Sequence, residues 1–119
     1  MAWVATSTKG GEPNVTPKGT VRVLDDQHII FADLFSLKTR QNLEQNPRVA
    51  VTVIDSATAK GYQIKGRAEM LTSGPTFEEM AKLLKGSPKA LPPLQYLVKI
   101  SVEAVYDQSV GPEAGKKIA

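Results

Sequence analysis

Hydrophobic and polar residues alternate with a period of two along most of this chain, and turn residues separate the runs. That period is typical of β-strands with one buried and one exposed face. The run GYQIKGRAEML is predicted to bury the face that carries Tyr62, Ile64, Ala68 and Met70. The run YLVKISVEAVYD is predicted to present one apolar row, made of Tyr96, Val98, Ile100, Val102, Ala104 and Tyr106. Both runs therefore indicate long strands.

Four further runs have the same character: WVATS, TVRVL, HIIFADL and RVAVTVID. RVAVTVID is so rich in β-branched residues that we expect it to be covered on both faces. The segments TKGGEP and DDQ contain the glycine and aspartate typical of tight turns. They predict antiparallel hairpins and a sheet that begins as a meander. The alternation thus indicates six strands.

Two helices are predicted between the strands. The first is expected at Ser36 to Gln45, and the second lies in SGPTFEEMAKLLKGSP, where Pro75 suits the first helical position and Gly86 the position just past the end. Six short antiparallel strands cannot bury both faces as a flat sheet, whereas closure into a small barrel removes the exposed edges. We therefore predict a mainly β fold, a six-stranded antiparallel closed or split β-barrel of Greek-key type with two short helices. The tail GPEAGKKIA is expected to be mobile unless a partner chain pins it.

The charges of the first predicted helix stand at the unfavourable end. Lys38 and Arg40 follow the expected N-cap residue Ser36 before any acid appears, whereas the second helix begins with glutamates and ends with lysines. Each exposed cation in the first turn costs about 0.3 to 1 kcal/mol at most. A bound phosphate would reverse the sign, because free N–H groups, a hydroxyl of Ser36 or Thr39 and the Lys38 ammonium form a phosphate site. The alternative is that both cations point into water and the small cost is tolerated.

Composition excludes much catalytic chemistry. The 119 residues are 41% hydrophobic and 23% charged, without an apolar run long enough to span a bilayer or a signal peptide, so we expect a single cytoplasmic domain spanning residues 1–119. The absence of cysteine and the single histidine, His28, exclude disulfides, thiolate zinc sites, cysteine nucleophiles and a histidine-rich metal site. His28 is expected at the surface or a strand end, and Gly10 and Gly11 are expected to be turn residues. The net charge of +3 is only weak evidence for a nucleic-acid partner.

Several short motifs follow one another in a specific order. A hairpin with P-N-V-x-P precedes a strand ending in FAD, a Lys-Thr helix start, an N-P-R-V strand and a G-x-A-E strand, here KGRAEM. In this order and spacing, nearly the whole chain resembles the flavin-binding split-barrel family, which includes pyridoxamine 5′-phosphate oxidase and small FMN-binding proteins. The resemblance implies a split barrel, FMN as the cofactor, and a homodimer with the flavin at the interface. We expect residues of the last strand and the tail, such as Tyr106, in that interface.

The resemblance also implies roles for individual residues. It assigns the FMN phosphate to Lys38 and Thr39, with Ser36 at the same helix entrance and Asn42 one turn further along. The strand implied to run beside the isoalloxazine ring is made of Val15, Thr16, Pro17 and Lys18, with backbone groups meeting the ring.

Three further residues are implied to surround the flavin. Ala32 and Asp33 would line the flavin and its ribityl chain, and Gln63 would lie on the other side of the ring. The alternative for Thr16 and Asp33 is that they are ordinary polar strand residues. No metal site and no catalytic side chain are identified.

The function predicted from these observations is FMN binding in a flavin-dependent oxidoreductase or electron-transfer protein with an unidentified redox partner. The pyridoxamine phosphate oxidases themselves hold substrate with an arginine and a histidine near the C-terminus, and this chain has neither after Arg67, which argues against that substrate. Arg22 and Arg40 are the arginines expected near the cleft. Alternatives are a flavin carrier or sensor without turnover, and an oligonucleotide-binding barrel, which the lack of an exposed aromatic row disfavours. A purely structural role would leave the helix charges unexplained.

Overall fold

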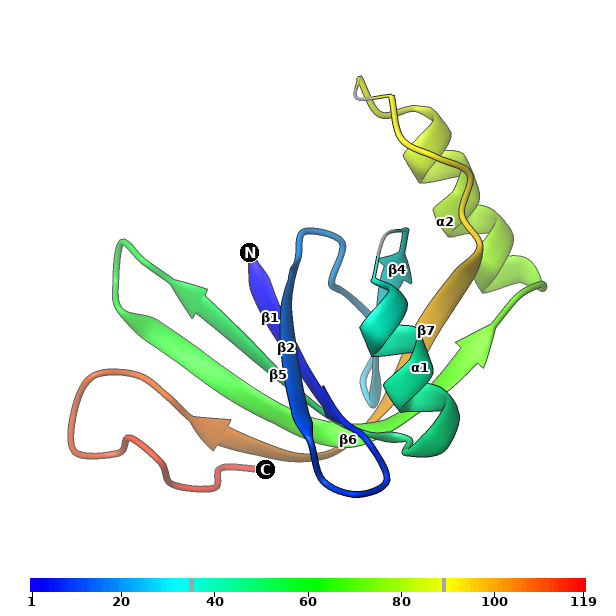
Figure 1. The fold of residues 1–119 in the computed structure, drawn as a ribbon. Coiled ribbons are helices and arrows are strands. Elements are labelled where there is room, and N and C mark those ends of the chain that lie inside the picture. The colour runs from blue at the N-terminus through cyan, green and yellow to red at the C-terminus, as the bar shows by residue number, and fades with distance from the viewer. Residues whose placement is uncertain (35, 89) are drawn as a thin grey trace.

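The structure is a computed structural model that describes residues 1–34, 36–88 and 90–119. Its elements in chain order are β1 (Ala2–Ser7), β2 (Pro13–Lys18), β3 (Arg22–Asp25), β4 (His28–Asp33), α1 (Leu37–Gln45), β5 (Arg48–Asp55), β6 (Lys60–Leu71), α2 (Pro75–Lys85) and β7 (Tyr96–Asp107) (Figure 1). Both predicted helices are confirmed. Ser36 occupies the N-cap position of α1, and Pro75 begins α2.

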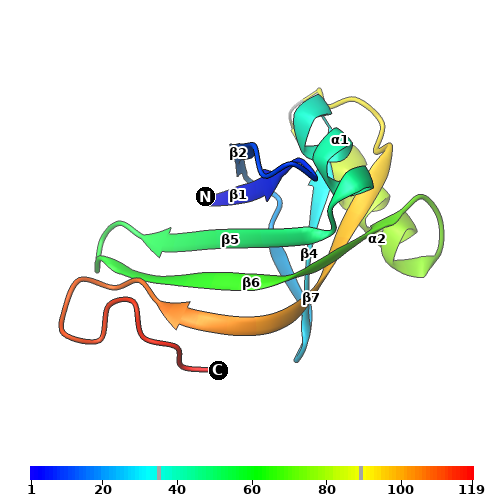
Figure 2. The ribbon, with the colours of Figure 1, turned by 60° about the horizontal axis from the view of Figure 1, so that its bottom comes forward.

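The strands form one antiparallel sheet in the order β2-β1-β5-β6-β7-β4-β3 (Figure 2). The predicted count of six strands is wrong, because the alternation did not reveal β2. This strand contains Pro13 and Pro17, and it lies at an edge of the sheet, where residues without an N–H group are tolerated. The meander is also wrong, since β2 and β3 lie at opposite edges of the sheet.

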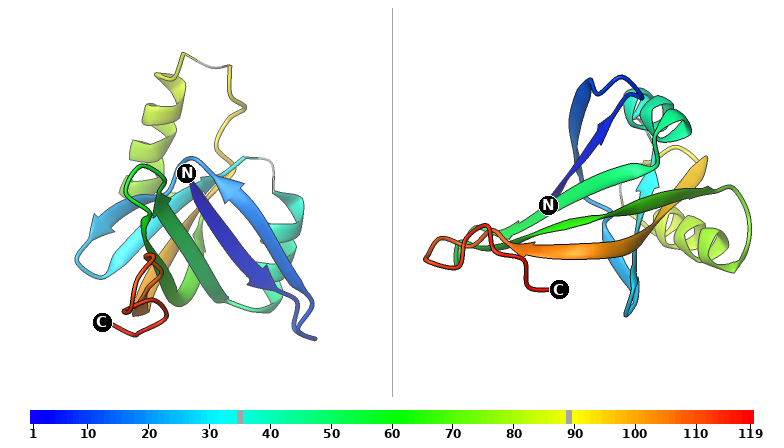
Figure 3. Two further views of the ribbon diagram at one scale, coloured as in Figure 1. Left: turned by 90° about the vertical axis from the view of Figure 1, so that its left-hand side faces the viewer. Right: turned by 90° about the horizontal axis from the view of Figure 1, so that it is seen from below.

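The sheet curls strongly but does not close, so that of the two predicted barrel forms the split one is correct (Figure 3). Inside the curl lies a core cluster that includes Val4, Phe31, Val51 and Ile100, and α1 adds Leu43 to it. This packing fixes α1 against the sheet near β1 and β2.

A second core cluster lies on the other face of β4. Met80 of α2 packs there with Ile30, Ala32 and Leu97. The strand covered on both faces is therefore β4, and the prediction that RVAVTVID would be covered on both faces is wrong. In β5 the inward residues Val49 and Val51 are buried, whereas its outward residues are only partly covered, because α2 docks on β4 instead.

The predicted single row on β7 is broken by a β-bulge. Lys65 pairs with Ala104, but the next residue of β6, Gly66, pairs with Val102, so one extra residue of β7 lies between them. A Cβ atom at position 66 would lie 2.1 Å from the Ser101 carbonyl oxygen, which explains the glycine. Past the bulge the faces of β7 exchange. As a result Tyr106 lies opposite Gln63 on the outward face rather than in the apolar row of Val98 and Ile100.

The C-terminal tail folds back on β7, contrary to the expectation of a mobile tail. β4 pairs only with residues 96–101 of β7, so the following part of that edge is free for another segment. The Val105 N–H donates to the Ala119 carbonyl at 3.0 Å, and the Asp107 N–H donates to the Lys116 carbonyl at 2.8 Å (Figure 2). The chain thus pins its own tail. In the described ranges, neither helix has the length and apolar character needed to cross a membrane.

Candidate functional site

A cavity of about 460 Å³ lies between β2, the end of β4 and the first turn of α1. Eight of the eleven predicted site residues line it, namely Val15, Thr16, Pro17, Lys18, Ala32, Ser36, Lys38 and Thr39. The volume is within the range of about 300 to 1,000 Å³ found for small-molecule sites. The fold therefore brings together residues that are up to 24 positions apart in the chain, since β2 ends beside the start of α1.

The first turn of α1 presents an uncompensated positive end to this cavity. Ser36 makes no side-chain cap hydrogen bond, and the first turn of the helix contains no acid. The Arg40 N–H donates to the Ser36 carbonyl at 3.2 Å, so the three preceding amides come before the intrahelical ladder. The charge arrangement that the sequence indicated is thus present in the structure. Of its two cations, Lys38 lines this cavity and Arg40 lines a neighbouring recess.

Thr39 contributes a buried hydroxyl without a described partner to the wall of the cavity. Its side chain is only 1% exposed, and its Oγ1 atom has no hydrogen-bond partner among the described residues. Leaving a buried hydroxyl unsatisfied costs about 1 to 3 kcal/mol, and this hydroxyl belongs to a residue of the cavity wall. A phosphate oxygen at the helix entrance would accept from Thr39, and free amides and Lys38 would stand beside it. The residues present therefore fit a phosphate group.

Beneath the cavity floor lies a buried polar cluster. Lys18 Nζ lies 3.3 Å from Asp33 Oδ1 and donates to Ser36 Oγ, and these contacts tie the end of β2 to the helix entrance. Asp33 is 2% exposed and also accepts from the Ser36 N–H at 2.9 Å and from the Tyr96 hydroxyl. Burial, and secondarily the bond to Asp33, raise the pKa of Tyr96 far above its usual value. Arg40 lies over the Tyr96 ring, with Cζ 5.9 Å from the ring centroid.

The remaining three predicted residues do not line this cavity. Asp33 lies behind it, as just described. Asn42 is fully buried on the inner side of α1, where its Nδ2 donates to Thr6 Oγ1 at 3.1 Å and its Oδ1 lacks a described partner. Gln63 lies on β6, between Thr52 and Tyr106 on the outward face of the sheet. Within one chain, Gln63 is therefore separated from the phosphate end of the site.

Sequence reasoning missed two residues that shape the site. The hydroxyl of Thr20 both accepts from the Ala32 N–H at 3.0 Å and donates to the Ala32 carbonyl at 3.1 Å, which holds the cavity wall to β4. Tyr96 reaches Asp33 because the two residues are directly paired between β7 and β4. A local pattern could not reveal either contact. Thr20 was predicted as the first residue of the strand TVRVL, whereas β3 begins only at Arg22.

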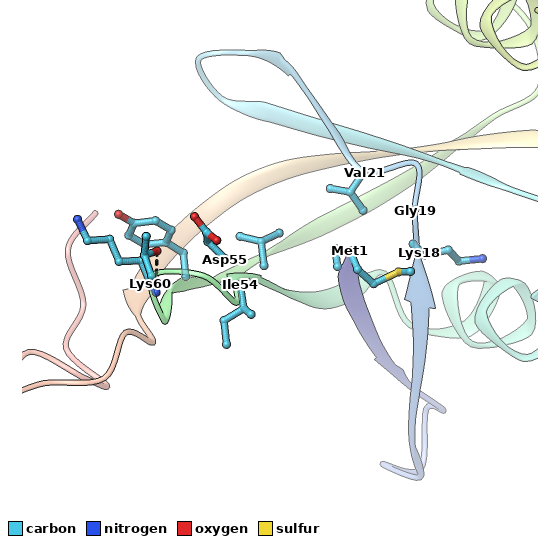
Figure 4. A pocket seen from close by; sticks show the side chains of 11 residues that line it. Met1, Lys18, Gly19, Val21, Ile54, Asp55 and Lys60 are labelled. Carbon is cyan, nitrogen blue, oxygen red and sulfur yellow. Dashed lines mark hydrogen bonds between the residues drawn. The ribbon is translucent and has the colours of Figure 1, made fainter. Parts of the chain in front are cut away.

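A larger cavity of about 620 Å³ lies on the other side of the end of β2 (Figure 4). Met1, Val21, Ile54 and Tyr62 contribute apolar wall, and Lys18 and Gly19 belong to both cavities. Figure 4 shows the Lys18 side chain directed away from this cavity. Its ammonium therefore lies at the entrance of α1, where it contacts Ser36.

The two arginines expected near the cleft behave differently. Arg40 lines a small recess with Asp33 and Tyr96 next to the helix entrance. Arg22 lies exposed on β3, at the opposite sheet edge from β2, and lines neither large cavity. Only Arg40 is thus placed close to the proposed site.

Comparisons with known proteins identify relatives of this chain. Residues 1–109 match the family model described as pyridoxamine 5′-phosphate oxidase. The chain is 36% identical over 124 aligned positions to MJ0282 of Methanocaldococcus jannaschii, described as an uncharacterised protein, with 100% of this chain and 80% of that protein covered.

Solved structures show the same fold. HupZ of Group A Streptococcus is similar with a TM-score of 0.83 and 31% identity, over 96% of this chain and 89% of that chain. An FMN-binding protein from Syntrophomonas wolfei subsp. wolfei is similar with a TM-score of 0.81 over 92% of this chain and 78% of that chain. At 19% identity, the second likeness concerns the fold alone.

Proposed function

Because this chain belongs to the pyridoxamine 5′-phosphate oxidase family, we propose that residues 1–119 form one domain that binds FMN noncovalently between β2 and the entrance of α1. The observation that carries the proposal is the buried hydroxyl of Thr39, which belongs to a residue of the cavity wall and has no described partner. A phosphate oxygen would satisfy it. Lys38 and the free amides of the first helical turn would complete the charge-assisted contacts. One monophosphate site favours FMN over a dinucleotide flavin.

The rest of the cavity suits the ribityl chain and one edge of the ring. β2 is an edge strand, so one of its two backbone edges is not paired with another strand of the sheet. Its residues Val15 to Lys18 line the cavity. That edge can donate to and accept from the polar rim of the isoalloxazine ring, except that Pro17 can only accept. Ala32 provides a small, close wall. A bound flavin supplies electron or hydride transfer, and the protein binds and orients it.

We also propose that two copies of the chain share the flavin sites. One cross-strand row on the outward face runs Pro17, Trp3, Thr52, Gln63 and Tyr106. Trp3 is 41% exposed there, which is unusual for a tryptophan without a binding partner. A two-fold related copy packed on this row would cover Trp3. It would also bring Gln63 and Tyr106 towards the flavin of the other copy, which is the role that the resemblance gives to Gln63.

The activity proposed is that of a flavin-dependent oxidoreductase or electron-transfer protein in the cytoplasm. The buried pair of Lys18 and Asp33 and the bare helix entrance favour a resident cofactor over a purely structural domain. An oligonucleotide-binding barrel is supported less well, because the polar residues Thr52 and Gln63 separate the aromatic residues Trp3 and Tyr106 in the outward cross-strand row.

A binding titration tests the cofactor assignment. The protein purified from cells should be yellow, with FMN as the released chromophore. In a fluorescence titration of apoprotein, Lys38→Ala should weaken FMN roughly tenfold to a hundredfold, because a charge-assisted contact contributes about 1.5 to 3 kcal/mol. Lys38→Glu should weaken it further, while riboflavin, which lacks the phosphate, should bind all forms alike. Lys82→Ala on α2 is the matched control for loss of an exposed lysine. Unchanged FMN affinity in Lys38→Glu would refute the assignment.

A second measurement separates an enzyme from a carrier. Stopped-flow mixing of the FMN-loaded protein with NADH or NADPH should bleach the flavin absorbance and restore it with an electron acceptor. Flavin that stays oxidised with both reductants, in protein that binds FMN tightly, would favour a carrier or sensor.

A further inference from the structure

Lys18 is the most deeply placed cation near the proposed site. It is the last residue of β2 and is only 9% exposed. Its ammonium lies 3.3 Å from Asp33 Oδ1, contacts Ser36 Oγ, and stands 5.7 Å from the centroid of the Phe31 ring. Lysine is almost never buried without a partner, because removing the ammonium from water is costly. Asp33 is the partner that makes the burial of Lys18 possible.

Lys18 is not the only hydrogen-bond donor to Asp33. The two carboxylate oxygens of Asp33 also accept from the Ser36 N–H and from the Tyr96 hydroxyl. An ammonium carries three N–H donors, and the described contacts of Lys18 with Asp33 and Ser36 use two of them. One donor remains for a group in the adjoining cavity, which Lys18 lines together with Ser36 and Thr39.

The contact with Ser36 has a further consequence for the helix. A serine at the N-cap ordinarily accepts from an amide of the first helical turn. Here the Ser36 hydroxyl is engaged by Lys18 instead and makes no cap bond. The interaction therefore keeps the amides of the first turn open towards the cavity, in addition to placing a second positive charge beside Lys38.

We propose that Lys18 is a second cationic ligand of the phosphate, and that Asp33 and Tyr96 are positioning residues that hold its ammonium at the helix entrance. The proposal rests on FMN binding at this site. Two cations and a free helix N-terminus match the charge of a phosphate monoester dianion, so the site should prefer phosphate monoesters to neutral flavins and to esters with a single negative charge. The competing interpretation is that Lys18 only neutralises Asp33.

The experiment measures the affinity for FMN and for riboflavin, which share the isoalloxazine ring. Any effect of a substitution on ring binding therefore cancels in the ratio of the two affinities. Lys18→Met keeps the aliphatic stem and removes the charge, and it should lower FMN affinity about tenfold without changing riboflavin affinity. Lys18→Arg retains the charge and should restore most of the preference. Tyr96→Phe should lower FMN preference several-fold, and an unchanged preference in this variant would overturn the positioning role.

The double variant Lys18→Met/Asp33→Asn distinguishes the two interpretations even if Lys18→Met alone folds poorly, because it buries no unpaired charge. If Lys18 contacts the phosphate, the double variant should also remain about tenfold weaker for FMN than wild type. Recovery of the wild-type preference in the double variant would overturn the proposal. The Lys38→Ala protein is titrated in parallel. If Lys38→Ala loses the preference for FMN and the Lys18 variants keep it, the role of Lys18 is contradicted and the proposed function stands. If the wild type does not prefer FMN to riboflavin, the proposed function itself is contradicted.

Discussion

Asp33 and Tyr96 are 63 residues apart in the chain, yet they are directly paired between β4 and β7, and the Tyr96 hydroxyl donates to the Asp33 carboxylate. Through its second oxygen Asp33 also accepts from the Ser36 N–H, just before α1 begins. The pairing of two central strands thus fixes the position of the helix entrance. Ser36, which precedes α1 and forms part of the cavity wall, is therefore attached to two central strands through Asp33.

Removing the hydroxyl of Thr39 should weaken FMN binding without destabilising the apoprotein. Thr39→Val keeps the shape of the side chain and removes a buried hydroxyl that lacks a described partner. We expect apoprotein stability to stay equal or to rise by about 1 kcal/mol, and FMN affinity to fall about tenfold, since the phosphate loses a donor. Urea unfolding of the apoprotein and an FMN titration measure the two quantities.

The matched control is Thr39→Ser, which keeps the hydroxyl and removes only a methyl group. It should lose some stability and retain FMN binding. A Thr39→Val protein that is markedly less stable without flavin would show that the hydroxyl has a partner in the apoprotein.

The alkaline stability of the protein should depend on Tyr96. Burial raises its pKa in the folded protein, whereas an unfolded tyrosine titrates near pH 10. The folded state therefore retains a proton that the unfolded state releases, so this contribution to stability is intact below about pH 10 and declines above it. Tyr96→Phe should be less stable at neutral pH, because Asp33 loses a donor, but its free energy of unfolding should fall less steeply at high pH.

Urea unfolding at several pH values from about 8 to 11 tests this prediction. Parallel curves for wild type and Tyr96→Phe would contradict it.

The outward row of the sheet should be the dimer interface. Light scattering of the FMN-loaded protein should give twice the 12.9 kDa chain mass. Trp3→Lys places a charge in the proposed interface and should shift the protein to monomers at micromolar concentration. Val23→Lys, at an exposed apolar position on β3 and outside the row, is the control and should remain dimeric. A Trp3→Lys protein that stays dimeric would place the interface elsewhere.

Gly66 should tolerate no side chain. A methyl group at this position would approach the Ser101 carbonyl oxygen to 2.1 Å, and backbone on both strands would have to move. We expect Gly66→Ala to lower the free energy of unfolding by roughly 2 to 4 kcal/mol. Gly10→Ala, whose Cβ would meet only Thr8 Oγ1 at 3.9 Å, should stay within about 0.5 kcal/mol of wild type. Similar unfolding midpoints for the two variants would contradict the account of the bulge.

Features that depend on neighbouring residues were predictable from the sequence. The alternation in β6, the alternation in β7 up to the bulge and the charges at the start of α1 are local, and the structure contains them. The roles of Lys38 and Thr39 as phosphate ligands stay predictions, although the structure places both residues at one cavity. β2 was hidden by its two prolines, because a strand at a sheet edge need not show the propensities of a central one.

Features that depend on distant partners were not predictable. Which strand is covered twice is decided by where α2 docks, and the pattern of RVAVTVID carries no information about that. The exchange of faces at Tyr106 follows from one extra residue in β7, opposite Gly66. Lys18 was assigned to the ring through its backbone, whereas its side chain points to Asp33 and Ser36. That direction exists only once β2 lies beside α1.

The position of β7 between β6 and β4 also bears on how the protein is made. β7 is the strand that joins β2-β1-β5-β6 to β4-β3, so neither group can complete the shared core without it. A ribosome adds about 5 to 20 residues per second. Because β7 is the last strand in the chain, residues 96–107 leave the exit tunnel after β1 to β6. Until then the inward faces of β1, β4 and β5 have no complete cover. Nascent chains stalled before β7 should therefore be sensitive to proteases and should bind chaperones, whereas chains released after the tail has emerged should be protected.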